Sequence, residues 1–594
     1  MGLPCCPRST FWKRFLIGVF CIGCVEVGWA QGFEEAVVNI GNVGLTITNA
    51  GFVGRANVRN NPAGPPSFEY PLDSGVEHLF EAGLWIGAVR RDGLITVRTG
   101  AITSSGGYRP GAEGYELAPL EPIVERSTLP TSPVFTRIAT SHQDFLTAYT
   151  DTARFLPGTR IPMPDPAGQL GVKILQTSYA WNFAFTESFV ILNFDLINLS
   201  NQPWDSVYVG LFHDLVVRNV NTTQDQGSAF FNKNGVGFID TLHATYAFNA
   251  GGTEESINTY GAIAFLGAEW RDPRSGQYRF FHPNVAEEYV RDGYTPPVVN
   301  PRWWLFSGGT DERSRPTDDR TRYQRMGTPY PNPADYGGCR GVHDLACQDP
   351  AYLEALRVWR EELRTAGQRA QGNWIGLTSV GPFGQVLPGD TLRVTFAFVG
   401  ALKPEAYQGL AARPIDNDDS RRLLYTNLFW ARRTYAGEDQ NYNGRLDPGE
   451  DVNGNGRLDR YLIPEPPPAP RERAEFTTEP DPQTGQLHTG VVLYWDRSAE
   501  AAIDPVTGRR DFEGYRIYRS NPGDDLRGNL LDRAVLIAQY DKPGNRIGFN
   551  TGFEAIRLPE PITFPGDTTQ YWYRFEMPNL RAGWQYLFIV TAFD

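Results

Sequence analysis

Residues 439–450 carry oxygen-bearing side chains at intervals that suit a hard divalent cation. A twelve-residue cation loop needs oxygens at positions 1, 3, 5, 7, 9 and 12, and a glycine at position 6 permits its sharp turn. The segment DQNYNGRLDPGE has Gly444 at position 6. The side chains at positions 1, 3, 5, 9 and 12, and the backbone carbonyl at position 7, come from Asp439, Asn441, Asn443, Asp447, Glu450 and Arg445. Because Ca²⁺ takes about six to eight such oxygens, the segment predicts a calcium site.

A second copy of the pattern follows at once. The pentapeptide NGRLD at 443–447 recurs at 455–459. Positions 1, 3, 5, 7 and 9 of this second loop are occupied by Asp451, Asn453, Asn455, Arg457 and Asp459. Position 12 is Leu462, so we expect no bidentate carboxylate to close the second loop.

The first loop resembles an EF-hand loop at each diagnostic position. Leu424, Leu428, Ala431 and Tyr435 recur at helical spacing before it and predict an entering helix. The proline-rich run after the second loop rules out an exiting helix. Two abutting loops are similar to the tandem calcium repeats of thrombospondin-type and other bacterial surface proteins, whereas a helix separates the two loops of a dockerin. The resemblance implies structural calcium in residues 411–462, with a proline-rich linker over 463–470.

The N-terminus predicts export. Residues 1–30 combine basic side chains, the apolar run FLIGVFCIG and a small residue, Ala30, before Gln31, a pattern typical of a secretory signal peptide. A single membrane anchor is one alternative, and a lipoprotein acylated at Cys24 is another. No later stretch approaches the roughly 20 apolar residues of a spanning helix. We therefore expect a secreted or outer-surface protein without a transmembrane segment in the mature chain.

Two cysteines remain beyond the signal region, Cys339 and Cys347. In an oxidising compartment, a pair with this spacing favours a local disulfide. His343 lies between them and raises the alternative of a zinc site, but two thiols and one imidazole lack a fourth nearby ligand.

Residues 31–410 predict a mainly β fold of antiparallel β-sandwiches, in one or two domains, with a helix at about 350–368. Alternating apolar residues at 190–196 and 207–211, separated by a turn at 201–203, indicate a β-hairpin or a longer-loop relative of one. The phrase GPF…LPGDTLRVTFAFV is loosely similar to a segment of large exported β-proteins of Bacteroidota-like bacteria. The whole chain is thus expected to be a multidomain β-protein with one or two helices and a calcium-loop linker.

Residues 471–594 predict a separate β-domain. Trp495 lies in an apolar strand, and Leu580, Gly583 and Tyr586 have the spacing of a tyrosine corner. Together these residues resemble a fibronectin type III domain, with a long stretch at 520–570 as a departure from the family pattern. That family has seven strands, and the strand after Tyr586 is the sixth. We therefore expect the last strand to be missing, either because the product is longer or because a partner supplies a strand.

Enzyme motifs are absent from the sequence, including GxSxG, HExxH and a P-loop. His213–Asp214 is the one adjacent imidazole–carboxylate pair of interest, and it more often marks a solvated strand end. A formal net charge of −13 disfavours nucleic acid as a partner. We expect a non-catalytic structural, adhesive or glycan-binding protein, with a polysaccharide or a surface or matrix component as partner. The alternative is an extracellular carbohydrate-active enzyme with an unrecognised carboxylate pair.

Overall fold

The computed structural model describes most of the chain after the N-terminal region. The described ranges are 32–56, 64–102, 109–223, 234–251, 257–306, 314–344, 346–365, 373–480, 487–504, 509–520, 534–545, 548–581 and 583–594. The predicted signal peptide, 1–30, and Cys24 lie outside the described residues.

Nine strands form the first sheet, with the main order β1-β2-β3-β5-β12-β18-β17. β4 pairs with β2 and β5, and β6 pairs with β5. The bounds are β1 (Glu35–Val38), β2 (Gly44–Thr48), β3 (Phe52–Val53), β4 (Phe68–Glu69), β5 (Val76–Val89), β6 (Ile95–Thr99), β12 (Asp205–Asn219), β17 (Val298–Leu305) and β18 (Trp374–Phe383).

Ten strands form the second sheet, with the main order β13-β14-β15-β19-β11-β10-β9-β7. β16 pairs with β15, and β8 pairs with β9. The bounds are β7 (Ala118–Pro119), β8 (Val124–Arg126), β9 (Gln143–Thr150), β10 (Val172–Ala180), β11 (Phe189–Asn198), β13 (Asn234–Ile239), β14 (Ala244–Asn249), β15 (Thr259–Arg271), β16 (Tyr278–Phe281) and β19 (Thr391–Leu402).

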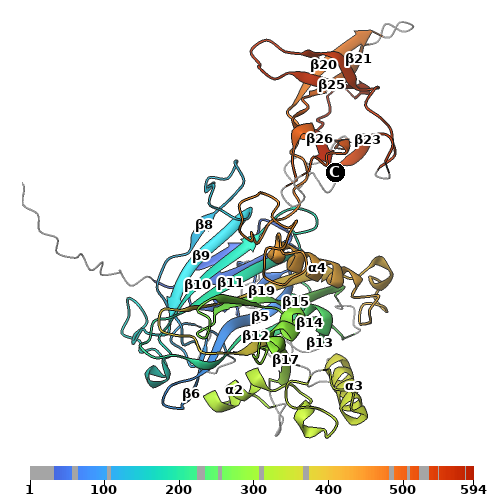
Figure 1. The fold of residues 1–594 in the computed structure, drawn as a ribbon. Coiled ribbons are helices and arrows are strands. Elements are labelled where there is room, and N and C mark those ends of the chain that lie inside the picture. Colours follow the sequence, from blue (N-terminus) through green and yellow to red (C-terminus); the bar gives the residue numbers. More distant parts are fainter. Residues whose placement is uncertain are drawn as a thin grey trace, which may run out of the picture.

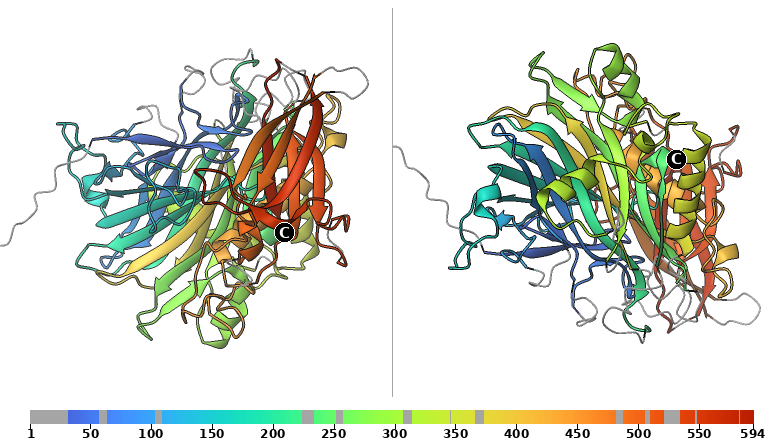
Figure 2. Two further views of the ribbon diagram at one scale, coloured as in Figure 1. Left: turned by 90° about the horizontal axis from the view of Figure 1, so that it is seen from above. Right: turned by 90° about the horizontal axis from the view of Figure 1, so that it is seen from below.

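The two sheets pack face to face around one large apolar core (Figure 2). Leu84 and Leu211 reach this core from the first sheet, and Ile174, Phe194 and Phe396 reach it from the second. Burial in β10 alternates residue by residue, as expected for a strand with one face on a core. The mainly β, antiparallel sandwich class predicted from the sequence is thereby confirmed.

Helices cover parts of both outer faces. α2 (Asp319–Gly327) places Met326 in a cluster with Trp85 and Phe212 on the first sheet. α4 (Arg422–Ala436) places Leu428 and Tyr435 on the outer face of the second sheet. The central strands are consequently buried on two sides, so their sequences contain few polar positions.

Two further helices lie at the margins. α1 (Ala286–Arg291) is short and follows β16. α3 (Pro350–Thr365) packs Trp359 and Leu363 into the main core. The helix expected over 350–368 thus begins at Pro350 and runs to Thr365, where the described range ends.

The predicted hairpin of residues 190–196 and 207–211 is wrong. β11 and β12 are strands, but β11 lies in the ten-stranded sheet and β12 in the nine-stranded sheet. β11 pairs with β10 and β19, and β12 pairs with β5 and β18. The turn at 201–203 therefore carries the chain from one layer of the sandwich to the other.

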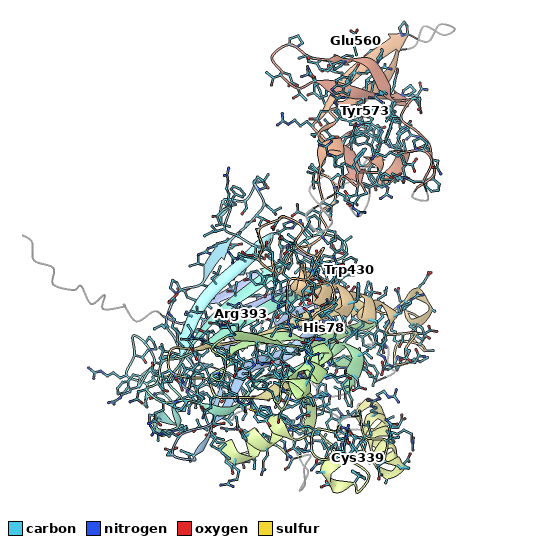
Figure 3. The ribbon with its side chains drawn as sticks, in the orientation of Figure 1. His78, Cys339, Arg393, Trp430, Glu560 and Tyr573 are labelled. Atoms are coloured by element: carbon cyan, nitrogen blue, oxygen red, sulfur yellow. A yellow bond between two sulfur atoms is a disulfide. The ribbon has the colours of Figure 1, made fainter. Side chains whose placement is uncertain are left out.

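The C-terminal domain consists of two small antiparallel sheets, with strand orders β20-β21-β25-β24 and β23-β22-β26. Trp495, which is fully buried, packs between them with Tyr515 and Tyr573. Figure 1 shows this domain set apart from the large sandwich, and Figure 3 labels Tyr573 and Glu560 on it. The bounds are β20 (Glu472–Pro480), β21 (Leu487–Trp495), β22 (Gly514–Arg519), β23 (Val535–Asp541), β24 (Arg557–Ile562), β25 (Tyr571–Leu580) and β26 (Phe588–Phe593).

Candidate metal centre

Residues 438–459 form a closed double loop at the end of α4. The helix ends at Ala436, and Gly437 follows with a φ of 61°, in the left-handed region that suits glycine. The N–H of Glu438 donates to the carbonyl of Asp459 at 3.0 Å, so the first and last residues of the double loop lie side by side. A Cβ at Gly437 would approach the Asp459 carbonyl oxygen to 2.2 Å, so glycine is required for this closure.

The first half of loop one is a tight turn around a buried carboxylate. Asp439 accepts hydrogen bonds from the backbone N–H groups of Asn443 and Gly444, both at 2.8 Å. Gly444 has a φ of 75° and lies against Phe280, where a Cβ would come within 2.2 Å of the ring. Position 6 of the loop therefore needs glycine both for its backbone conformation and for packing.

Glu450 closes the first loop. Its two carboxylate oxygens accept hydrogen bonds from the backbone N–H groups of Gln440 and Asp447, each at 2.9 Å. The carboxylate of Asp447 accepts hydrogen bonds from the side-chain amides of Asn441 and Asn443, both at 2.7 Å. These two amide donors hold the pKa of Asp447 below its usual range. The predicted side chains of loop one therefore gather around one turn.

Loop two repeats this geometry on the surface. Asp451 accepts hydrogen bonds from the N–H groups of Asn455 and Gly456 at 3.1 and 3.0 Å. The side-chain amides of Asn453 and Asn455 donate to Asp459 at 2.7 and 2.6 Å. Asn453 and Asn455 are exposed, so the second loop is more open to solvent than the first.

The residues at position 7 are held in matching turns. Arg445 N–H donates to the Asn443 side-chain oxygen at 2.8 Å, and Arg457 N–H donates to the Asn455 side-chain oxygen at 2.7 Å. Each asparagine thus fixes the backbone just before the carbonyl expected to face a cation.

Glu438 closes the second loop, although Leu462 at position 12 predicted that no carboxylate would close it. The carboxylate of Glu438 accepts hydrogen bonds from the N–H groups of Val452 and Asp459, each at 2.9 Å. These are loop positions 2 and 9, the same two positions that Glu450 holds in loop one. Each loop is therefore closed by the glutamate that immediately precedes position 1 of the other loop.

A sequence signal for Glu438 exists. The double loop is a twelve-residue repeat that starts with Glu-Asp, in EDQNYNGRLDPG and EDVNGNGRLDRY. Counting forward from Asp439 and Asp451 leaves the first glutamate of the repeat outside both loops. Aligning the two repeats from their Glu-Asp pairs would have placed Glu438 and Glu450 in equivalent roles.

Both closing glutamates are buried without a cationic partner. Glu438 is 1% exposed and Glu450 is 6% exposed. Within the described ranges, no Lys, Arg or His nitrogen lies within 4 Å of either carboxylate. Asp439, fully buried, has Arg460 at 3.8 Å, and burial raises its pKa. Buried negative charge of this kind is costly unless a cation compensates it.

The donor chemistry fits a hard cation that accepts mixed oxygen ligands. Across the described residues, no three His, Cys, Asp or Glu side chains by themselves form a metal cluster. Each loop instead combines carboxylates with Asn amide oxygens and a backbone carbonyl. Calcium accepts this mixture, whereas zinc prefers imidazole and thiolate.

Ion pairs and ring contacts attach the double loop to the large sandwich. Arg445 pairs with Glu288 of α1 at 2.6 Å. Arg460 pairs with Glu269 of β15 at 2.9 Å, and its guanidinium lies 4.6 Å from the ring centre of Phe280 in β16. The double loop is therefore packed on the sandwich, and the extended chain begins after it, at residues 463–470.

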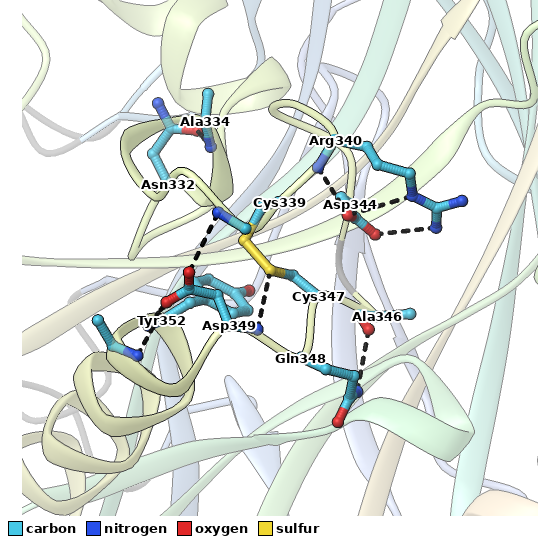
Figure 4. Close-up of a disulfide and its surroundings, with 12 residues drawn as sticks. Asn332, Ala334, Cys339, Arg340, Asp344, Ala346, Cys347, Gln348, Asp349 and Tyr352 are labelled. Atoms are coloured by element: carbon cyan, nitrogen blue, oxygen red, sulfur yellow. Dashed lines mark hydrogen bonds and ion pairs between the residues drawn. A yellow bond between two sulfur atoms is a disulfide. The ribbon is translucent and has the colours of Figure 1, made fainter.

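The predicted disulfide is present (Figure 4). Cys339 and Cys347 are bonded, with their Cα atoms 5.2 Å apart. Asp349 accepts a hydrogen bond from Gly338 N–H at 3.1 Å and so joins the disulfide loop to the start of α3. His343 lines a pocket of mainly apolar residues beside β13 and β17, and the two thiols are consumed by their bond.

His213–Asp214 is a core pair, and its expected place at a solvated strand end is wrong. Both residues lie in β12 and are at most 2% exposed. Burial lowers the pKa of His213 to about 3 and raises that of Asp214 to about 8. Glu81 lies opposite Asp214 on β5 and is 1% exposed. A polysaccharide cannot reach these carboxyl groups, so they do not supply the pair that a glycosidase needs.

No protein-family model matches the chain, and no curated protein matches it. None of the helices in the described part is long and apolar enough to cross a lipid bilayer.

Proposed function

We propose that this chain is an exported structural or adhesive protein in which two calcium ions fix the base of a C-terminal β-domain. The observation that carries the proposal is that a buried glutamate closes each loop: Glu450, from loop one itself, and Glu438, which precedes loop one and closes loop two. Two carboxylates that are withdrawn from water and lack a cationic side chain are best compensated by bound divalent cations.

The donor set of each ion follows from the repeat. Loop one supplies Asp439, Asn441, Asn443, Asp447, Glu450 and the carbonyl of Arg445. Loop two supplies Asp451, Asn453, Asn455, Asp459, the carbonyl of Arg457 and, from upstream, Glu438. Bound calcium would neutralise the carboxylates and lock the two turns, and a structural role of this kind requires no opening motion.

The location of the double loop gives calcium its role. α4 enters it from the outer face of the second sheet, and Arg460 binds Glu269 just after it. The next residues are the proline-rich segment 463–470, which is stiff because proline fixes its own φ. Ordering the double loop would therefore fix the direction in which the linker leaves the sandwich.

An extracellular setting suits both stabilising devices. Extracellular calcium modules bind calcium with dissociation constants of about 10⁻⁴–10⁻³ M, so millimolar calcium occupies such sites. The disulfide between Cys339 and Cys347 also persists best in an oxidising compartment. With the fibronectin type III-like C-terminal domain, these features favour a modular surface or secreted protein that binds a polysaccharide or a matrix component.

Limited proteolysis tests the calcium role. With EDTA, residues 437–463 should become the first site of cleavage, and millimolar calcium should protect them. Magnesium at the same concentration is the control, because Mg²⁺ demands a smaller and more rigid octahedral site. Equal cleavage of this segment in EDTA and in calcium would overturn the proposal.

A second experiment tests the partner class. Residues 31–435 and the full chain are screened on a glycan array and, in parallel, for hydrolysis of the same glycans. Binding without hydrolysis supports an adhesive role. Hydrolysis would instead support the alternative function, a carbohydrate-active enzyme. That activity should persist in EDTA, because structural calcium takes no part in the cleavage.

A further inference from the structure

A cleft lies at one end of the large sandwich, where strands of both sheets begin or end. It has a volume of about 590 Å³, within the range of about 300–1,000 Å³ that is typical of small-molecule sites. In the first sheet, β12 begins at Asp205 and β18 ends at Phe383, and in the second sheet β15 ends at Arg271. The lining comes from the chain around these strand ends and from residues 294–297.

A short backbone bridge positions two polar side chains in this cleft. Trp204 and Val386 exchange both backbone hydrogen bonds, at 3.0 and 2.9 Å, and their side chains belong to the main core. Because side chains alternate along extended backbone, the next residue in one segment, Asp205, and the preceding residue in the other, Gln385, point away from that core and line the cleft. The Gln385 side-chain amide donates to the Asp205 carboxylate at 3.1 Å. The bridge therefore holds both polar groups in place.

Two charged groups of the cleft keep unused hydrogen-bonding capacity. Each carboxylate oxygen of Asp205 accepts one hydrogen bond, from Ser206 and from Gln385, although a carboxylate offers about four acceptor positions. Arg274 is exposed and donates to the Gly293 carbonyl at 3.4 Å, and the described residues place no carboxylate within 4 Å of its guanidinium. The cleft thus offers a ligand both an acceptor and a charged donor.

Apolar groups complete the lining of the cleft. They are aromatic rings and prolines from both sheets and from the segment 294–297: Trp270, Tyr294, Phe383, Pro273, Pro297 and Pro382. The exposed residue Gly384 lies against the buried indole of Trp270, where a Cβ would come within 2.9 Å of the ring. Any larger residue at position 384 would have to displace that indole, so glycine preserves this wall of the cleft.

We propose that this cleft binds a neutral sugar unit of a polysaccharide without cleaving it, an inference that rests on the proposed glycan-binding function. Hydroxyl groups on adjacent ring carbons both donate and accept, so they can pair with Asp205 and Arg274 at the same time. The C–H faces of a pyranose ring are apolar and suit the aromatic and proline lining. A sugar acid fits less well, because its carboxylate would approach that of Asp205.

Asp272 is a second carboxylate in the lining of the cleft, and its surroundings oppose hydrolysis. It is fully buried and accepts hydrogen bonds from the Tyr294 hydroxyl at 2.6 Å, the Ser275 hydroxyl at 2.7 Å and the Arg279 guanidinium at 3.3 Å. Burial by itself would raise the pKa of Asp272, but these donors and the Arg274 N–H outweigh burial and lower the pKa to about 2. A glycosidase needs one carboxyl group as a proton donor and another as a base or nucleophile. Asp272 is ionised and enclosed by donors, so it can fill neither role.

Short glycans test the cleft directly. The probes are cellohexaose, xylohexaose, mannohexaose and chitohexaose, and their binding to the full chain is measured by isothermal titration calorimetry. Asp205→Asn and Arg274→Ala should each weaken binding of the recognised probe by about tenfold or more, because each removes a charged hydrogen-bonding partner. Glu113→Gln is the matched control, since it removes a carboxylate from an exposed position outside the cleft, and it should leave the affinity within about threefold.

The possible results separate the cleft from the function on which it rests. Arg274 is exposed, so Arg274→Ala should weaken binding while the melting temperature stays nearly unchanged. Probe binding that both cleft variants leave intact would overturn the cleft assignment and leave the glycan-binding function standing. Failure of every probe to bind at millimolar concentration would overturn the cleft proposal, and a glycan array without any bound glycan would overturn the function as well. Release of shorter oligosaccharides by the original chain, lost in Asp205→Asn, would overturn binding without cleavage in favour of an enzyme.

Discussion

Exchanging the two closing glutamates for glutamine, one at a time, tests the double loop most directly. Glu438→Gln and Glu450→Gln each keep one acceptor oxygen and lose the second, together with the charge. Each carboxylate now receives two backbone N–H groups. Without calcium, the lost charge-assisted bond costs about 1.5–3 kcal/mol, and removal of an uncompensated buried charge offsets part of that cost.

The informative quantity is the stabilisation that calcium adds. For a site with a dissociation constant near 10⁻⁴ M, 1 mM calcium stabilises the folded state by about 1.4 kcal/mol. Two filled sites in the original chain would contribute about 2.8 kcal/mol if they act independently. Either glutamine variant should retain at most about half of this gain, because it loses the closing ligand of one ion.

Isothermal titration calorimetry and urea unfolding with and without calcium measure the two quantities. The original chain should bind two ions, and each variant should bind one. Glu287→Gln, an exposed change on nearby α1, is the matched control and should retain both ions. If Glu438→Gln still bound two ions, Glu438 would be dispensable for loop two. That result would refute the assignment of Glu438 as the closing ligand of loop two.

Three other predictions rest on groups outside the double loop. Replacing Cys339 and Cys347 by serine should cost up to about 2–3 kcal/mol of stability, from the lost loop-closure constraint, and non-reducing peptide mapping should find the bond in exported protein. Burial lowers the pKa of Lys403 to about 8 from an ordinary value near 10.5, so the folded state binds fewer protons and stability should rise between these pH values. Lys403→Met should remove that rise when pH-dependent unfolding of the two proteins is compared. Burial also lowers the pKa values of His78 and His243 to about 4, so their contribution to stability is present above pH 6.5 and should be lost as the pH falls toward 4. Chemical unfolding of His78→Asn should show a smaller loss over that interval.

The sequence predicted the local features that depend on neighbouring residues. The gathering of the loop-one side chains around one turn, the helix that precedes it and the disulfide all follow from spacings of twelve residues or fewer, whereas the bound calcium stays a prediction. Residues 422–436 form a helix because their apolar side chains fall on one face, which packs mainly on β19 of the second sheet. Short-range geometry of this kind can be read directly from the residues.

The errors concern partners that lie far apart in the sequence. β11 and β12 follow each other closely, yet β11 pairs with β19, so that Phe189 lies opposite Val399. Alternation of apolar residues identifies a strand but does not state which sheet it joins. His213–Asp214 was expected at a solvated strand end, as such pairs more often are, whereas β12 lies between the main core and a cluster that includes Met326 of α2.

The positions of the two closing glutamates also predict that the two proposed ions, if bound, are coupled. Glu450 closes loop one and is joined by one peptide bond to Asp451, which opens loop two. Glu438 closes loop two and stands beside Asp439 in the same manner. An ion that orders either loop therefore places a ligand of the other, which favours the second ion, while repulsion between the ions opposes it. Positive cooperativity in the titration would mean that preorganisation outweighs this repulsion, and both glutamine variants would then weaken the remaining site as well.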